Sequence, residues 1–161
     1  MRRFGHLAGR REERWDEPFL AALYLAARPD LGALPVPASV IDGIARHQRA
    51  LRDDDYARRY PQAARWVIED AGKPVAWLML AEQEEGLRVV ELAVAPDARR
   101  RGVASTLLRA LHDEARPLAL RVRRENAAAR ALYVRLGFTL RREAAPEEAA
   151  PDEAALELRW E

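Results

Sequence analysis

One segment, Val89–Leu108, constrains what this chain can fold into more than any other. It reads VVELAVAPDARRRGVASTLL, so that an apolar run typical of a strand breaks at Ala95-Pro96, an arginine-rich loop follows, and an amphipathic helix begins near Gly102. The first N–H groups of a helix have no internal partner and carry about half a positive charge. A phosphate fits there, and a glycine lets the backbone come close to it. The segment therefore predicts an anion site, although a solvated basic patch is the commoner fate of arginine runs.

Two common phosphate-binding loops do not match this segment. A Walker loop needs Gly-Lys followed by Ser or Thr, and the only lysine, Lys73, precedes Pro74. A Rossmann fingerprint needs three glycines, and this loop has one. What remains, Arg99-x-x-Gly102-x-Ala104, resembles the pyrophosphate loop of the GNAT superfamily of acyl-CoA-dependent N-acyltransferases.

A second block agrees with this resemblance. Asn126-x-x-Ala129-x-x-Leu132-Tyr133, followed by Leu136-Gly137-Phe138, is similar to another signature of the same superfamily. The two motifs occur in the expected order, about twenty residues apart. The resemblance implies a GNAT fold of the mixed α/β class, with a central mixed sheet of about six to seven strands and about four helices, and acetyl-CoA as co-substrate.

The resemblance also implies the residues that hold the cofactor. The strand before the loop carries a bulge in this superfamily, and motif alignment places it at Leu92–Val94, whose side chains belong to the core in either case. Asn126 has two open interpretations, because it also caps the helix that begins at Ala127. The full cofactor set is Leu92, Ala93, Val94, Arg99, Arg100, Arg101, Gly102, Val103, Ala104, Ser105, Asn126 and Tyr133.

Two side chains are the candidates for proton transfer. The family counterpart of Tyr133 acts as general acid, and a phenol stays protonated at neutral pH and can donate to a leaving thiolate. An aromatic packing residue is the alternative. Glu91, before the predicted bulge, is the first candidate for the base that takes the proton of the amine, and Glu82 is the second. A structural salt bridge explains either carboxylate equally well.

Composition excludes several other classes of chemistry. The 161 residues are long enough for one domain, residues 1–161. There is no cysteine, and the three histidines lie far apart, so we expect no metal site. Ser105 lacks the flanking glycines of a nucleophile elbow. A net charge of +1 gives no overall attraction to nucleic acid.

The location also follows from composition. No apolar run reaches the roughly 18 residues of a membrane span, and the basic N-terminus has no apolar region typical of a secretory signal. We therefore expect a cytoplasmic protein without a membrane partner.

Periodicity predicts the elements around the motifs. We expect a helix capped by Asp16, a loop over Leu31–Pro37, and a second helix with a capping box at Ser39 and Asp42. The inner face of this second helix would carry Ile41, Ile44, Ala45 and Leu51. Further strands are expected at 65–69, 75–81, 87–95, 118–122, 138–141 and 156–160, with helices at 102–115 and 127–136. The usual first strand of the superfamily is hard to find before Asp16.

The resemblance implies a primary amine on a small molecule or a peptide as the acceptor, to which the acetyl group is transferred by direct attack. The acidic stretches Asp53–Asp55 and Glu147–Glu153 would suit a cationic amine, although such runs are usually solvated surface. Dimers are common in the resembled family, and an exposed edge at Trp160 could serve a homodimer. The alternative function is a catalytically silent acyl-CoA-binding or protein-interaction domain of the same fold.

Overall fold

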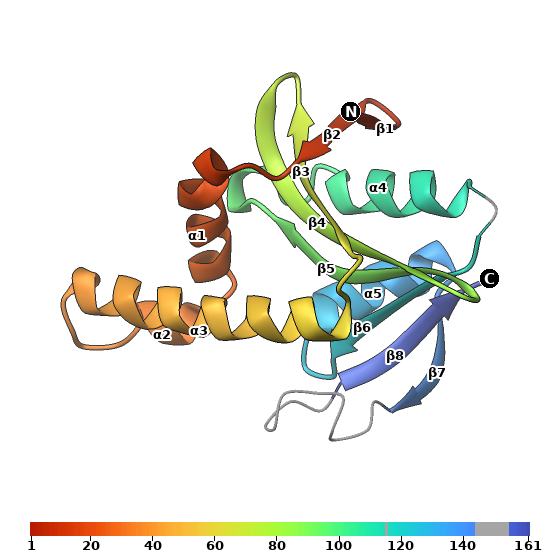
Figure 1. Ribbon diagram of the computed structural model, residues 1–161. Coiled ribbons are helices and arrows are strands. Elements are labelled where there is room, and N and C mark those ends of the chain that lie inside the picture. Colours follow the sequence, from red (N-terminus) through yellow and green to blue (C-terminus); the bar gives the residue numbers. More distant parts are fainter. Residues whose placement is uncertain (115, 144–154) are drawn as a thin grey trace.

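The computed structural model describes residues 1–114, 116–143 and 155–161. Within them, eight strands form one mixed sheet in the order β1-β2-β3-β4-β5-β6-β8-β7 (Figure 1). The strands are β1 (Arg2–Phe4), β2 (Leu7–Arg11), β3 (Ala64–Asp70), β4 (Lys73–Gln83), β5 (Gly86–Val94), β6 (Leu118–Arg123), β7 (Thr139–Glu143) and β8 (Ala155–Trp160). The helices are α1 (Glu17–Ala26), α2 (Pro29–Gly32), α3 (Ala38–Arg59), α4 (Val103–His112) and α5 (Ala127–Leu136), with 3-10 turns η1 (Arg14–Asp16) and η2 (Pro96–Ala98).

The predicted mixed α/β fold is confirmed, with one strand more than the upper expectation. Figure 1 shows α1 and α3 on one side of the sheet and α4 on the other, and α5 packs beside α4. The run Val75–Ala81 in β4 is buried throughout, because both of its faces are covered. In α4, Val103, Leu107, Leu108 and Leu111 are buried as the helical periodicity predicted.

The sheet opens between β5 and β6. These two strands are parallel and pair only from Leu87 with Leu118 to Val89 with Leu120. Beyond Val89, β5 stays paired with β4 alone, up to Val94 opposite Ala76. The last five residues of β5 therefore have one strand edge free, and this edge leads directly to the arginine-rich loop.

The helix ends at Asn126 and Gly137 form as expected. The Asn126 Oδ1 accepts from the Ala129 N–H at 3.1 Å and caps α5. At the other end Gly137 has φ +107°, and the N–H groups of Gly137 and Phe138 donate to the carbonyls of Val134 and Tyr133. This is a Schellman motif, in which a glycine at the left-handed position ends the helix.

The N-terminal part of the chain departs from the predictions. The missing first strand exists as β2, which pairs with β3 and forms a hairpin with β1. Asp16 stands at the start of α1 but does not cap it, because its buried carboxylate accepts from Arg10 and from the Glu13 N–H. The expected loop over 31–37 begins inside the short helix α2.

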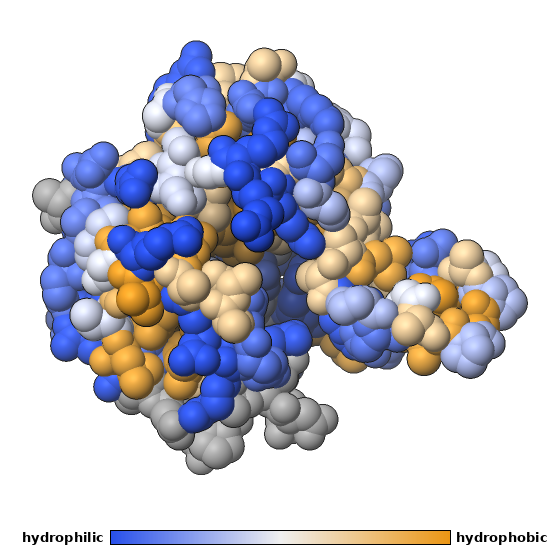
Figure 2. Space-filling view, turned by 180° about the vertical axis from the view of Figure 1, so that it is seen from behind, coloured by the Kyte–Doolittle hydropathy of each residue, from blue (hydrophilic) through white to orange (hydrophobic). Residues whose placement is uncertain are grey.

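The predicted start of α3 is also wrong. Pro37 occupies the N-cap position without a side-chain hydrogen bond, so Ser39 and Asp42 lie inside the helix and form no capping box. Figure 2 shows α2 and the first turns of α3 as a projecting lobe with apolar side chains on its surface. Farther along α3, Ala45 and Arg49 are buried and Tyr56 packs against the core, whereas Leu51 is exposed.

Trp160 does not present a free edge. Its ring stacks on His112 with centroids 3.8 Å apart and packs against Phe138 at 5.4 Å. The indole is therefore engaged within the chain, and the homodimer stays a prediction without this support.

Candidate active site

The arginine-rich loop ends in a backbone turn that only certain residues adopt easily. Gly102, at the N-cap of α4, has φ +82°, and Arg100 has φ +61°. Arg100 therefore holds a left-handed conformation that disfavours a side chain. A Cβ at Gly102 would meet nothing within 4 Å, so its backbone angle, and not a close contact inside the protein, calls for glycine there.

The start of α4 has the properties of an anion site. No side chain caps it, and the first internal bond runs from the Thr106 N–H to the Gly102 carbonyl. The N–H groups of Val103, Ala104 and Ser105 precede that bond and are the unpaired donors of the first turn. The three loop arginines are all exposed, Arg99 bonding the Val94 carbonyl through Nε at 3.1 Å and Arg101 lying 3.5 Å from Asp70.

Successive residues of β5 point their backbone N–H and carbonyl groups alternately toward β4 and toward the free edge. The Ala95 N–H donates to the Val75 carbonyl at 2.8 Å. Because antiparallel strands alternate, Ala93 points its N–H and carbonyl to β4, whereas Leu92 and Val94 point theirs to the open side. The bulge, however, lies at Val90, between the pairs Met79–Glu91 and Leu80–Val89, and not at 92–94 as predicted. The N–H groups of Leu92 and Val94 thus face the open side, whereas the Val94 carbonyl already accepts from Arg99 and the backbone of Ala93 faces β4.

Tyr133 lies on α5 beside Phe138, with ring centroids 5.5 Å apart. Burial, and after it the negative charge of Glu91, raise the pKa of the phenol to about 12. The phenol is therefore protonated at neutral pH and can act as a donor. The charge of Glu91 on β5 thus acts on the pKa of Tyr133 on α5.

The Glu91 side chain points toward α3. Its Oε2 accepts from the Tyr56 hydroxyl at 2.7 Å, and the Arg52 Nη1 lies 4.0 Å away. Burial and the charge of Glu91 raise the pKa of Tyr56, so this phenol too is a stable donor. Sequence reasoning missed Tyr56 and Arg52, and their spacing of four residues on one face of α3 was the available signal.

A small cleft lies beside Glu91, between α1, α3 and the sheet. Its lining is Glu12, Leu20, Leu23, Tyr24, Ala27, Arg49, Arg52, Asp53, Trp77, Glu91 and Ala93, and its free volume is about 40 Å³. Of the acidic stretch after residue 52, only Asp53 lines this cleft, and Asp55 pairs with Arg58 and Arg59. The other acidic stretch, 147–153, lies outside the described residues.

Glu82 is not a candidate base. Its side chain is 70% exposed and pairs with Arg116 at 2.6 Å, at the far end of β4 from the free edge. For this carboxylate the salt-bridge interpretation holds.

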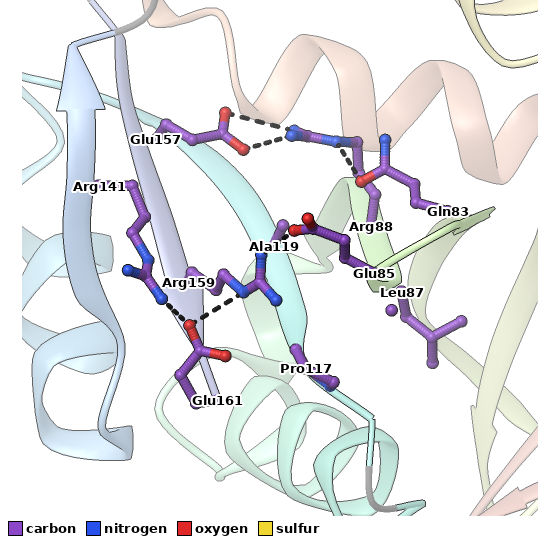
Figure 3. A pocket seen from close by; sticks show the side chains of 11 residues that line it. Gln83, Glu85, Leu87, Arg88, Pro117, Ala119, Arg141, Glu157, Arg159 and Glu161 are labelled. Carbon is purple, nitrogen blue, oxygen red and sulfur yellow. Dashed lines mark hydrogen bonds and ion pairs between the residues drawn. The ribbon is translucent and has the colours of Figure 1, made fainter.

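A larger cavity, about 420 Å³, lies where β5 begins (Figure 3). Arg88 and Glu157 are both buried there and form an ion pair, which Arg121 joins at 3.0 Å. Figure 3 shows Arg159 between Glu85 and Glu161. The arginines that line the cavity are thus already paired, and about six residues of strand, roughly 20 Å, separate it from the loop after β5. This cavity is not the candidate site.

Two kinds of feature, a metal cluster and a membrane-spanning helix, are absent from the described residues. No group of three or more His, Cys, Asp or Glu residues is placed to hold a metal ion. None of the helices there combines the length and apolar content that crossing a bilayer requires.

The sequence and the fold both match known proteins. A model of the acetyltransferase (GNAT) family matches residues 20–138. No curated protein sequence matches significantly. The ribosomal-protein-S18-alanine N-acetyltransferase of Escherichia coli is 24% identical, with a TM-score of 0.63 over 95% of this chain and 92% of its own.

Two further structures are similar. Naa50 of Arabidopsis thaliana, solved with a bisubstrate analogue of CoA, is 16% identical, with a TM-score of 0.61 over 98% of this chain and 99% of its own. A nourseothricin acetyltransferase is 26% identical, with a TM-score of 0.50, and the match spans 62% of this chain and 65% of that protein. The identities of 24% and 16% are low, so those two likenesses show the fold alone.

Proposed function

Because this chain belongs to the acetyltransferase (GNAT) family, we propose that it transfers the acetyl group of acetyl-CoA directly to a primary amine. The observation that carries the proposal is the open edge of β5, where the N–H groups of Leu92 and Val94 face the open side, on the strand that leads through the arginine-rich loop to an uncapped helix start. Glu91 belongs to β5 itself, and its charge acts on the pKa of Tyr133 on α5. The catalytic unit is the whole of residues 1–161, and its cytoplasmic location stays a prediction.

The loop and the start of α4 would hold the pyrophosphate. The N–H groups of Val103, Ala104 and Ser105 point outward at the positive end of the helix, and the exposed loop arginines add charge. Asn126, whose Oδ1 is already used by the cap of α5, keeps its side-chain N–H₂ for the cofactor. The bound acetyl-CoA supplies an activated thioester carbonyl.

The chain's own groups would then carry the transfer. Glu91 takes a proton from the acceptor ammonium, and the neutral amine forms a bond to the thioester carbonyl carbon. The N–H groups of Leu92 and Val94 stabilise the charge that develops on the carbonyl oxygen. Tyr133 gives its proton to the thiolate as the carbon–sulfur bond breaks, and the nitrogen loses its extra proton to solvent as the amide forms. Glu91 then releases its proton to solvent, and Tyr133 takes one back.

A titration with acetyl-CoA tests the cofactor site. We expect micromolar binding by calorimetry, lost in the double variant Arg99→Ala/Gly102→Asp, because a carboxylate would replace the phosphate at the helix start. Glu82→Gln, remote from the loop, is the matched control and should bind as the native chain does. Absence of binding to acetyl-CoA and to longer acyl-CoAs would refute the proposal.

A second candidate is an acyl-CoA-binding domain of the same fold without turnover. The free volume of about 40 Å³ beside Glu91 favours it, since this space holds only a few water molecules. Tyr133→Phe separates the two candidates. In an enzyme, turnover should fall about 100-fold or more with unchanged acetyl-CoA affinity, whereas in a silent domain no amine in a screen gives turnover above the hydrolysis background.

A further inference from the structure

The guanidinium of Arg52 lies among three aromatic rings. Its central carbon is 5.2 Å from the centroid of Tyr24, 5.6 Å from that of Tyr56 and 5.3 Å from that of Trp77. The rings come from α1, α3 and β4, so the tertiary fold, not local sequence, brings them together. All three distances are within the range in which ring faces attract a cation, about 6 Å.

Two carboxylates complete this environment. Asp53 Oδ1 accepts from Nε and Nη2 of Arg52 at 3.2 and 2.9 Å, and Glu91 Oε2 lies 4.0 Å from Nη1. Burial alone would lower the pKa of Arg52, but the charges of Glu91 and Asp53 more than offset it, and the pKa lies above its ordinary value. The surroundings therefore favour a positive charge even away from water. We call the rings of Tyr24, Tyr56 and Trp77 with the carboxylates of Asp53 and Glu91 the cation box.

The position of the box connects it with the proposed transfer. Glu91 is both a wall of the box and the proposed acceptor of the amine proton, so an acceptor ammonium must come within hydrogen-bond distance of it. The Arg52 head group is a cation that already stands 4.0 Å from Glu91. The space left beside it, about 40 Å³, is too small for an alkylamine.

We propose that the cation box is the acceptor subsite for a primary alkylammonium group, and that Arg52 occupies it until the acceptor displaces its head group. This inference rests on the proposed function only in the role of Glu91. The long, flexible side chain of Arg52 is 27% exposed and can turn toward solvent. Competition between the internal guanidinium and the ammonium then sets the acceptor affinity.

The experiment measures binding without catalysis. n-Butylammonium chloride is titrated into the native chain and into Arg52→Ala, with tryptophan fluorescence as the readout because Trp77 is a wall of the box. n-Butanol is the uncharged control ligand, and potassium chloride matches the ionic strength. Arg58→Ala is the matched control variant, because Arg58 lies on the same helix with its side chain 77% exposed.

The expected result is a dissociation constant for n-butylammonium at least ten-fold lower in Arg52→Ala than in the native chain or in Arg58→Ala, with no binding of n-butanol. Unchanged affinity overturns the proposal. So does binding of sodium butyrate to the native chain that Arg52→Ala loses, since Arg52 would then be a receptor for an acceptor carboxylate.

A second variant guards against misfolding. Arg52→Met keeps the apolar stem, and it should give the same gain in n-butylammonium affinity with a native-like thermal transition. If Arg52→Met folds and shows no gain, the proposal fails irrespective of the behaviour of the alanine variant. Acetyl-CoA binding to the same samples tests the proposed function separately, so either idea can fail without the other.

Discussion

Asp16 joins β2 to the first helical turns through a buried carboxylate. Its side chain is 3% exposed, Oδ1 and Oδ2 accept from the two terminal nitrogens of Arg10 at 2.6 and 2.8 Å, and Oδ2 also accepts from the Glu13 N–H at 2.8 Å. Asp16→Asn keeps the volume and one oxygen for the Glu13 N–H, but it removes the charge. Arg10 keeps a second partner, Glu69, at 2.7 Å.

The size of the effect follows from this geometry. Breaking a buried ion pair by removing one partner costs about 3–5 kcal/mol. Because Arg10 is 24% exposed and keeps Glu69, we expect a loss of about 2–3 kcal/mol in the free energy of unfolding. At about 2–4 °C per kcal/mol for a chain of this size, the melting temperature should fall by about 5–10 °C.

The loss should depend on pH with a defined sign. Hydrogen bonds from Arg10 lower the pKa of Asp16, burial opposes this, and the Glu13 N–H lowers it again, so the net direction is downward. A carboxyl with a lowered folded-state pKa stabilises the fold above its unfolded pKa of about 3.9, and this contribution is lost as the pH falls through the folded value. The difference between the native chain and Asp16→Asn should therefore be full at pH 7 and narrow below about pH 4.

Urea unfolding, followed by tryptophan fluorescence between pH 7 and pH 3, measures this difference. Asp30→Asn is the matched control, because Arg28 binds Asp30 through two hydrogen bonds of 2.9 and 2.7 Å in the same paired manner, but at the surface. We expect no measurable change for this exposed pair. Equal losses in both variants, or a loss for Asp16→Asn that stays constant with pH, would refute the reasoning.

Three further predictions concern the backbone and the phenol. Arg100→Gly should raise the melting temperature by about 2–4 °C, because relief of the left-handed strain is worth about 1 kcal/mol; a decrease on thermal unfolding would contradict this. Gly137→Ala should destabilise more than Gly72→Ala, because both have positive φ but a Cβ at Gly137 would also lie 3.1 Å from Trp160 Nε1, whereas one at Gly72 meets nothing within 4 Å; equal losses in denaturant unfolding would show that the contact is harmless. With a pKa of about 12 for Tyr133, amine acetylation should show no decline from phenol ionisation up to about pH 10, and a fall in kcat near pH 9 that Tyr133→Phe abolishes would contradict its environment.

The motifs that are local in sequence were the ones sequence reasoning predicted well. The amphipathic face of α4, the cap at Asn126 and the helix end at Gly137 each depend on residues within about four positions of one another. Their geometry is decided by backbone hydrogen bonds that the same segment supplies. The strand β4 was equally clear, because an unbroken apolar run is stable only where both faces of the strand are covered.

Features that depend on distant partners were missed. A capping box at Ser39 was plausible from spacing, but Pro37 is the N-cap, so the helix starts two residues earlier and Ser39 lies inside it. Asp16 had the right residue type for a cap, yet Arg10 competes for its carboxylate. The bulge lies at Val90 because its position depends on how β5 pairs with β4, which the sequence of β5 alone does not determine. Likewise, nothing near Glu91 in sequence announces Tyr56, which is 35 residues away.

The short pairing between β5 and β6 divides the backbone network of the sheet into two parts. Five strands lie on one side and three on the other, and only the stretch Leu87–Val89 carries ladder hydrogen bonds between them in the described residues. Local opening at this seam would separate the halves without breaking any hairpin, so the amides of β6 and β8 can exchange with solvent independently of those of β3 and β4. A ligand that bonds the free edge of β5 while touching α5 would span both halves and make them exchange as one cooperative unit.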